Sequence, residues 1–82
     1  MPIKALRARS FIVTLNNPKN ELSDYESAAK KANAIWFTAQ LEKGANGTVH
    51  VQAALGFKNP TLAGTVTKIF PGCHVERAKA PA

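Results

Sequence analysis

One turn signal in the middle of the chain sharply limits the folds that this sequence can adopt. Residues 43–47 read Lys-Gly-Ala-Asn-Gly, and the Asn-Gly step with two nearby glycines is typical of a tight β-hairpin. The flanking segments, residues 34–42 and 48–57, carry apolar side chains at alternate positions, as half-buried strands do. The sequence therefore predicts an antiparallel pair of strands at its centre.

The segment before this hairpin predicts a strand followed by a helix. Residues 9–16 are rich in β-branched and aromatic residues, and Asn-Asn-Pro at residues 16–18 is expected to end the strand. Ser23 and Glu26 have the spacing of a capping box, with Ser23 as N-cap. We expect a helix from there to Asn33.

The segment after the hairpin predicts strand, helix and strand again. Asn59-Pro60 is expected to end the third strand, and Thr61 to cap a second helix that runs to Phe70. Residues 73–77 predict a short fourth strand. The order β-α-β-β-α-β is typical of an α+β, ferredoxin-like fold, with an antiparallel sheet, both helices on one face and the other face open.

Composition excludes several classes of protein. The 82 residues allow one domain, and the single cysteine, Cys73, allows neither an internal disulfide nor a cysteine-based zinc site. No apolar run approaches the ~20 residues needed to span a bilayer, so no membrane-spanning segment is expected. The 11 Lys and Arg against 5 Asp and Glu give a net charge of +6, which points to a polyanion, either nucleic acid or an anionic membrane surface. Of these we expect nucleic acid, and no membrane, as the partner.

Strand alternation sorts the side chains onto two faces, and the apolar set must face the helices. The polar set collects on the open face: Thr14, Asn16, Gln40, Glu42, His50, Gln52, His74 and Glu76. The hairpin folds Glu42 back towards His50. Two interpretations are open: the ordinary wet face of a half-buried sheet, or a site for a hard divalent cation, Mn²⁺ or Mg²⁺, bound by nitrogen and oxygen ligands.

Three short motifs, in this order, resemble those of a known family. Residues 13–18 read Val-Thr-Leu-Asn-Asn-Pro, residues 42–52 run from Glu-Lys-Gly to His-Val-Gln, and residues 73–79 read Cys-His-Val-Glu-Arg-Ala-Lys. Over about residues 9–79 the chain resembles the replication initiator (Rep) proteins of circoviruses and related circular single-stranded DNA viruses.

The resemblance implies an HUH-type endonuclease domain, here with His-x-Gln, that nicks and rejoins one strand of a viral origin during rolling-circle replication. It implies these ligands of Mn²⁺ or Mg²⁺: Glu42, His50 and Gln52. It implies a part in DNA recognition for three residues of the first motif: Thr14, Asn16 and Asn17. The expected partner is single-stranded origin DNA or its hairpin. A homo-oligomer through regions outside this sequence is compatible with the resemblance, and the expected location is the nucleus of a eukaryotic host, or otherwise the cell interior.

Further DNA contacts are expected from residues that flank the motif strands: Arg7, Arg9, His74, Arg77 and Lys79. The alternative is that the basic residues are solvated surface charges and that His74 has a structural role. Trp36 falls on the open face by alternation, where it either stacks on a base or lies beneath a further helix.

In one respect the sequence departs from the family. The family's third motif places a catalytic tyrosine on a helix after the fourth strand, whereas the only tyrosine here is Tyr25. It lies beside the start of the first helix, so we expect it in the core and not as a nucleophile. We therefore expect residues 1–82 to be an endonuclease domain without its catalytic helix, which retains metal and DNA binding.

A second class of function has the same layout. A non-catalytic module that binds single-stranded nucleic acid, as RNA-recognition domains do, also uses the open face of a four-stranded sheet. Such modules need aromatic side chains on that face. Alternation instead directs Phe11, Phe37 and Phe57 into the core, which argues against this class.

Overall fold

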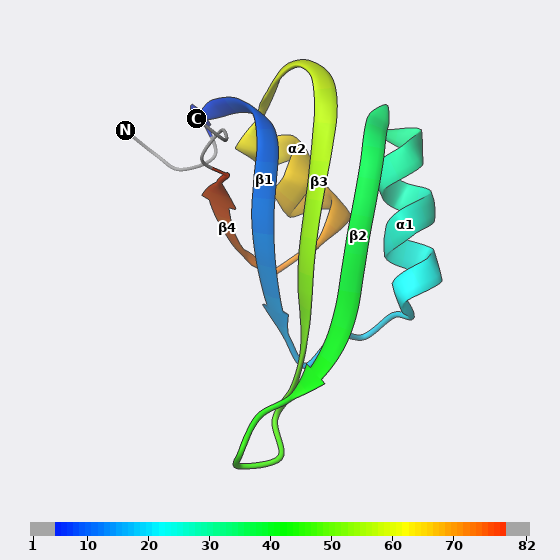
Figure 1. Cartoon of the computed structure of the whole chain (residues 1–82), viewed down its shortest axis with the longest axis vertical. Helices are drawn as coiled ribbons and strands as arrows, with labels where there is room; N and C mark the ends of the chain where they lie inside the picture. The colour runs from blue at the N-terminus through cyan, green and yellow to red at the C-terminus, as the bar shows by residue number, and fades with distance from the viewer. Residues whose placement is uncertain (1–4, 79–82) are drawn as a thin grey trace.

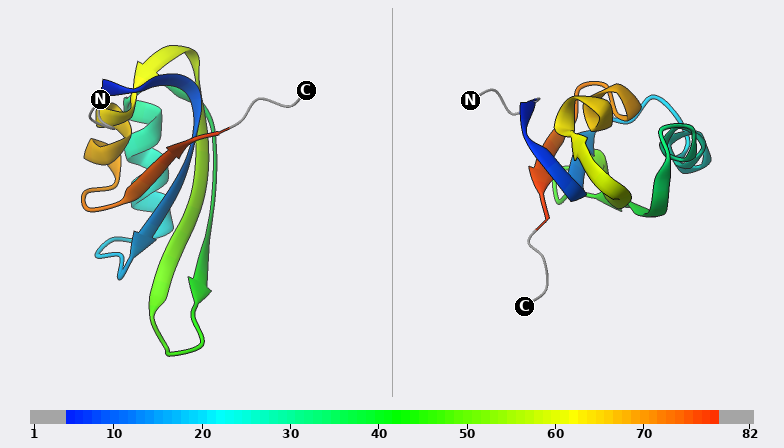
Figure 2. Two further views of the ribbon diagram at one scale, coloured as in Figure 1. Left: turned by 90° about the vertical axis from the view of Figure 1, so that its left-hand side faces the viewer. Right: turned by 90° about the horizontal axis from the view of Figure 1, so that it is seen from above.

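The computed structural model describes residues 5–78 and has the α+β architecture that the sequence predicts. The elements are β1 (Arg7–Asn16), α1 (Leu22–Lys31), β2 (Ala34–Lys43), β3 (Val49–Leu62), α2 (Ala63–Ile69) and β4 (His74–Arg77). The strands form one antiparallel sheet in the order β2-β3-β1-β4. Both helices lie on the same face of the sheet, and the opposite face is open (Figures 1 and 2).

The central hairpin is confirmed. The backbone N–H of Gly44 donates to the carbonyl of Thr48 at 2.7 Å, and Gly47 adopts a φ of 87° that L side chains rarely adopt. Glu42 is paired with His50 in the second rung from the turn, after the pair of Lys43 with Val49. The turn projects beyond the helices at the lower end of the molecule in Figure 1.

Helix α1 begins earlier than predicted. Its N-cap is Glu21, whose backbone N–H donates to the carboxylate of Asp24 at 3.0 Å, so the capping pair lies two residues before the predicted Ser23 and Glu26. An acidic residue in the first turn also interacts favourably with the helix dipole. The predicted end is confirmed, because Asn33 follows the C-cap with a left-handed φ of 72°.

Strands β1 and β3 are longer than predicted. Arg7 pairs with Leu62, whereas Ser10 already pairs with Gly56, so the ladder contains an irregularity between these points. Pro60 lies within it, where its missing N–H removes no regular ladder bond. The prediction that Asn59-Pro60 ends the third strand was therefore wrong.

The N-cap of helix α2 lies one residue after the predicted cap, Thr61. Its N-cap is Leu62, and the backbone N–H of Ala63 donates to the carbonyl of Leu6 at 2.8 Å. The hydroxyl of Thr61 donates instead to the carbonyl of Asn59. A contact with the residue that precedes β1, distant in sequence, thus replaces the local cap that was predicted.

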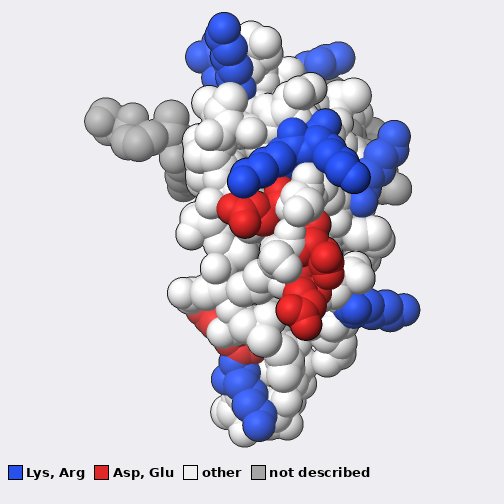
Figure 3. Space-filling model, turned by 90° about the vertical axis from the view of Figure 1, so that its right-hand side faces the viewer, with Lys and Arg blue, Asp and Glu red and all other residues white. Residues whose placement is uncertain are grey.

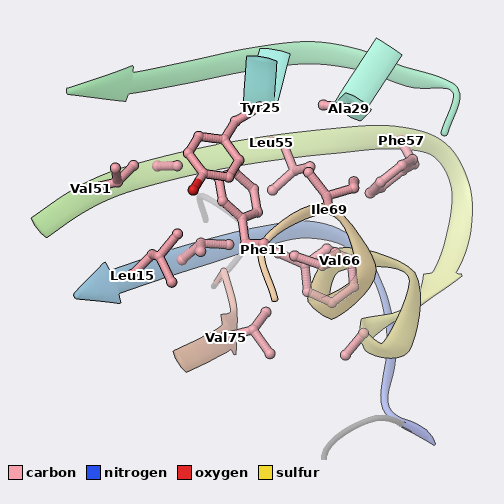
Figure 4. Close-up of a cluster of buried hydrophobic side chains, with 14 residues drawn as sticks. Phe11, Leu15, Tyr25, Ala29, Val51, Leu55, Phe57, Val66, Ile69 and Val75 are labelled. Carbon is pink, nitrogen blue, oxygen red and sulfur yellow. The ribbon is translucent and has the colours of Figure 1, made fainter. Parts of the chain in front are cut away.

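The core lies between the sheet and the two helices (Figure 4). The ring of Tyr25 stacks on Phe70 with centroids 4.9 Å apart, and Phe70 stacks on Phe37 at 6.2 Å. Tyr25 is only 3% exposed, and Phe11 and Phe57 are buried too, as predicted. No helix in residues 5–78 is long and apolar enough to cross a membrane.

Candidate metal and DNA-binding face

The open face carries polar side chains in two rungs near the hairpin turn. The strand pairing sets the rungs as Glu42–His50–Asn16 and Gln40–Gln52–Thr14–His74. Directly paired residues project on the same side of a sheet. Side chains from all four strands therefore line one surface, as alternation predicts.

Glu42 and His50 are in direct contact. His50 Nε2 lies 3.1 Å from Glu42 Oε1, and the side-chain amide of Gln40 donates to the other carboxylate oxygen. Both side chains are only part-exposed, at 39% for Glu42 and 21% for His50. The carboxylate is therefore held between two neighbours with one oxygen directed at the imidazole.

Gln52, on the next rung, has a side-chain oxygen that could act as a third metal ligand. Its side-chain oxygen accepts a hydrogen bond of 3.4 Å from the hydroxyl of Thr14, which restricts the amide. Across residues 5–78 no three His, Cys, Asp or Glu side chains gather as a metal site. A site built on Glu42 and His50 would therefore depend on this amide oxygen, and a set of nitrogen and oxygen donors without thiolate suits Mn²⁺ or Mg²⁺.

Asn16 and Asn17, from the first motif, occupy different environments. Asn16 is paired with His50 and shares its face. Asn17 directly follows β1 in a left-handed conformation, φ 52°, and its backbone N–H donates to the carbonyl of Val49 at 2.8 Å. Asn17 therefore has a structural role in the turn, independent of the predicted contact with DNA.

Replacing Asn17 tests its structural role in the turn. Asn17→Val places a β-branched residue at a left-handed position, which we expect to cost about 1–2 kcal/mol. That loss corresponds to a fall in Tm of several degrees for a domain of this size, measured by circular dichroism. Asn17→Gly should retain the Tm. If Asn17→Gly lowers the Tm as much as Asn17→Val, the backbone argument is wrong.

His74 lies apart from the three residues that the resemblance implies as metal ligands. It is paired with Thr14, so strand β1 separates it from His50 and Gln52 on β3. Its Nε2 lies 3.1 Å from Glu76 Oε1, and both side chains are well exposed. The structure therefore places His74 on the open face without bringing it to Glu42 and His50.

The basic residues are distributed over both faces. Arg77 is paired with Phe11, which is buried under the helices, so Arg77 projects from the helix side at the edge of the sheet. Leu6 and Ala8 pack against the core, which turns Arg7 away from it. Arg9 is exposed. The predicted contact at Lys79 lies outside the described residues.

The side of the molecule that carries α1 is mixed in charge. Figure 3 views this side and shows acidic side chains flanked by Lys and Arg. Helix α1 has Asp24 in its first turn and Lys30 and Lys31 in its last. This balance makes the α1 side less suited to a polyanion than the rest of a chain with a net charge of +6.

Cys73 is half-buried against the core. Burial raises the pKa of its thiol, and this outweighs the opposite effect of a backbone hydrogen bond. The thiol is therefore protonated at neutral pH and is a poor nucleophile or metal ligand. Cys73 thus serves as a small side chain packed against the core.

Two contributors to the face were missed by sequence reasoning. Gln40 was placed on the open face but not as a contact of Glu42, although a spacing of two residues on a strand puts both on one side. Gly56 lies beneath Trp36. A glycine inside a strand is a signal for close approach by another group.

Comparison with known proteins identifies the family. Residues 8–82 match a family model described as "Putative viral replication protein". The chain belongs to this family. The resemblance read from the three motifs is thus confirmed at the level of the viral replication proteins.

Two relatives from this group show how much of a replication protein is covered. The chain is 32% identical over 71 residues to the replication-associated protein of beak and feather disease virus, covering 87% of this chain and 25% of that protein. It is 36% identical over 66 residues to the master replication protein of subterranean clover stunt virus (strain F), covering 80% of this chain and 21% of that protein. The chain thus spans about a quarter or less of the length of these relatives.

Proposed function

We propose that this chain provides the metal- and DNA-binding sheet of a replication initiator that nicks and rejoins one strand of a viral origin in rolling-circle replication. The observation that carries the proposal is the contact of Glu42 with His50, together with the position of Gln52 on the next rung of the same open face. Membership of the viral replication protein family supports it. The expected partner is single-stranded origin DNA or its hairpin.

Within this proposal the chain's own side chains hold and orient the site. Glu42 supplies the negative charge that a hard cation requires, and Gln40 keeps its carboxylate in place. Thr14 fixes the amide of Gln52. A bound Mn²⁺ or Mg²⁺ would polarise the scissile phosphate and offset charge on its oxygens.

Cleavage in the proposed reaction requires a tyrosine hydroxyl. Its oxygen attacks phosphorus and gives up its proton, the bond to the 3′ oxygen breaks, and that oxygen takes up a proton in exchange, which leaves a 5′-phosphotyrosyl link and a free 3′-OH. The phosphodiester is conserved in the new bond, so the strand can be rejoined. Tyr25 is buried on the helix side of the sheet, opposite the face of Glu42 and His50, and does not meet this requirement.

The proposal predicts binding without covalent attachment. With a labelled single-stranded origin hairpin and Mn²⁺, the chain should bind the DNA in a native gel, and added salt should weaken binding steeply. A denaturing gel should show no protein–DNA adduct. Tyr25→Phe is the matched variant and should behave identically in both gels. An adduct that disappears in Tyr25→Phe, or a failure to bind the hairpin even at low salt, would contradict the proposal.

The non-catalytic alternative predicts a different response to metal. RNA-recognition domains stack bases on aromatic residues of the central strands, whereas Phe11 of β1 and Phe57 of β3 are in the core. Such a module should also bind with equal affinity in Mn²⁺ and in EDTA. Greater affinity in Mn²⁺, lost in His50→Ala, is the result expected for the initiator.

A further inference from the structure

Trp36 lies flat on the open face at the end remote from the hairpin turn. It is paired with Gly56 on β3, and a Cβ atom built on Gly56 would overlap the five-membered ring of the indole. Gly56 is consequently buried although it belongs to the open face. The indole itself is 44% exposed, so one of its faces covers the glycine and the other meets solvent.

The surface between Trp36 and the proposed metal ligands is hollowed. A shallow depression of about 300 Å³ is lined by Ile12, Thr38, Gln40, Gln52 and Ala54, among others. Its small floor residue, Ala54, lies between Thr38 and Ile12 in one rung of the sheet. Ile12 is 43% exposed, which adds an apolar side chain to this surface. The depression thus lies on the open face between Glu42 and His50 at one end and Trp36 at the other.

The distance between Trp36 and the proposed metal ligands suits a few nucleotides. Trp36 and Glu42 are six residues apart on β2, which corresponds to roughly 20 Å along a strand. Stacked nucleotides are spaced at about 3.4 Å along one strand of DNA, so about six would span it and fewer would suffice if extended.

A lysine lies on the same side of the sheet as the indole. Lys58 follows Gly56 by two residues, and the intervening Phe57 is buried in the core. Alternation therefore places Lys58 on the side of Trp36, where it is exposed. An aromatic face with a cation on the same side of the sheet matches a base with its adjacent phosphate.

We propose that Trp36 is a base-stacking subsite for single-stranded DNA, at the opposite end of the open face from the metal ligands. This inference rests on the proposed function, because it assigns one contact of the DNA that the initiator would hold. Stacking uses the π-face that every base has, so the subsite would add affinity without selecting a sequence. It would anchor the strand several nucleotides from the scissile phosphate.

The experiment uses the indole as its own reporter, since Trp36 is the only tryptophan in the chain. Titration with a single-stranded oligonucleotide of about twelve nucleotides should quench the intrinsic fluorescence. Trp36→Ala should weaken binding about tenfold, measured by anisotropy of the labelled oligonucleotide, and Trp36→Phe should weaken it less. Ile35→Ala, at the neighbouring and more exposed apolar residue, is the matched control and should bind normally.

Two further arms test the geometry and the ligand. Gly56→Ala should displace the indole and weaken binding although Trp36 is still present. An abasic oligonucleotide of equal length should bind wild type and Trp36→Ala equally, because it offers phosphates and no bases. Circular dichroism should show that every variant keeps the wild-type spectrum, and if Trp36→Ala fails to fold, Trp36→Phe takes its place in the comparison.

The outcomes separate this inference from the proposed function. Wild-type protein that does not bind the oligonucleotide at low salt would overturn both. Salt-dependent binding with unchanged fluorescence, and equal affinity in Trp36→Ala, would overturn the stacking subsite alone. A fluorescence change with protein concentration in the absence of DNA would also overturn it, because the indole would then be covered by a second copy of the chain.

Discussion

His50→Ala is expected to weaken Mn²⁺ binding by at least about 100-fold, measured by calorimetric titration. The imidazole contributes one of three proposed ligands, and its Nε2 lies 3.1 Å from Glu42 Oε1. Even changes to groups that only support metal ligands cost 10- to 100-fold in affinity. Removal of a ligand should cost more, since a carboxylate and an amide oxygen alone hold a divalent cation weakly.

The chain provides a matched control for this prediction. His74 is on the same open face and also contacts a glutamate, Glu76. Strand β1 separates it from β3, which carries His50. His74→Ala should therefore leave Mn²⁺ affinity unchanged. Equal loss in both variants would indicate non-specific binding to histidine, and an unchanged affinity in His50→Ala would show that the ligand assignment is wrong.

Phe70→Ala is expected to reduce the free energy of unfolding by about 3–5 kcal/mol. Phe70 is completely buried at the end of α2, and its ring stacks on Tyr25 of α1 and on Phe37 of β2. It thus joins both helices and an edge strand. Since small domains are stable by only about 5–15 kcal/mol, this loss should leave a marginal fold.

Urea denaturation followed by circular dichroism would measure the effect. Phe70→Leu keeps most of the apolar volume and should cost clearly less, since it leaves a smaller cavity. Ile35→Ala, at a side chain that is 65% exposed, should change stability by about 0.5 kcal/mol or less. If Phe70→Ala and Ile35→Ala cost the same, the stacked ring does not join the helices to the sheet in the way described.

Local chemistry was sufficient to predict the order of elements. The glycines of the hairpin turn and the alternation in the strands beside it fix the pairing of Glu42 with His50. The ends of elements were predicted less well. Glu21 with Asp24 and Ser23 with Glu26 both have capping-box spacing, and the sequence alone does not rank them. Pro60 is tolerated in β3 because of an irregularity that depends on β1, which is distant in sequence.

The positions of the site residues also divide into those that local sequence predicts and those that depend on strands distant in sequence. The pairing of Glu42 with His50 across the hairpin followed from strand alternation. The position of His74 did not, because it depends on β4 pairing with β1 and not with β3. The flat packing of Trp36 on Gly56 also depends on register across two strands. Residues that a single turn brings together can thus be predicted, whereas those brought together by strand order need the structure.

The pairing of β2 with β3 restricts how this sequence can change in length during evolution. One residue inserted within β2 or β3 would shift the register and move Glu42, or His50 and Gln52, to the helix side. An insertion in the projecting turn after Gly44 and before Thr48 would leave the ladder unchanged. Relatives that retain the site should therefore differ in length at the tip of the hairpin and keep the strands beside it free of single-residue insertions.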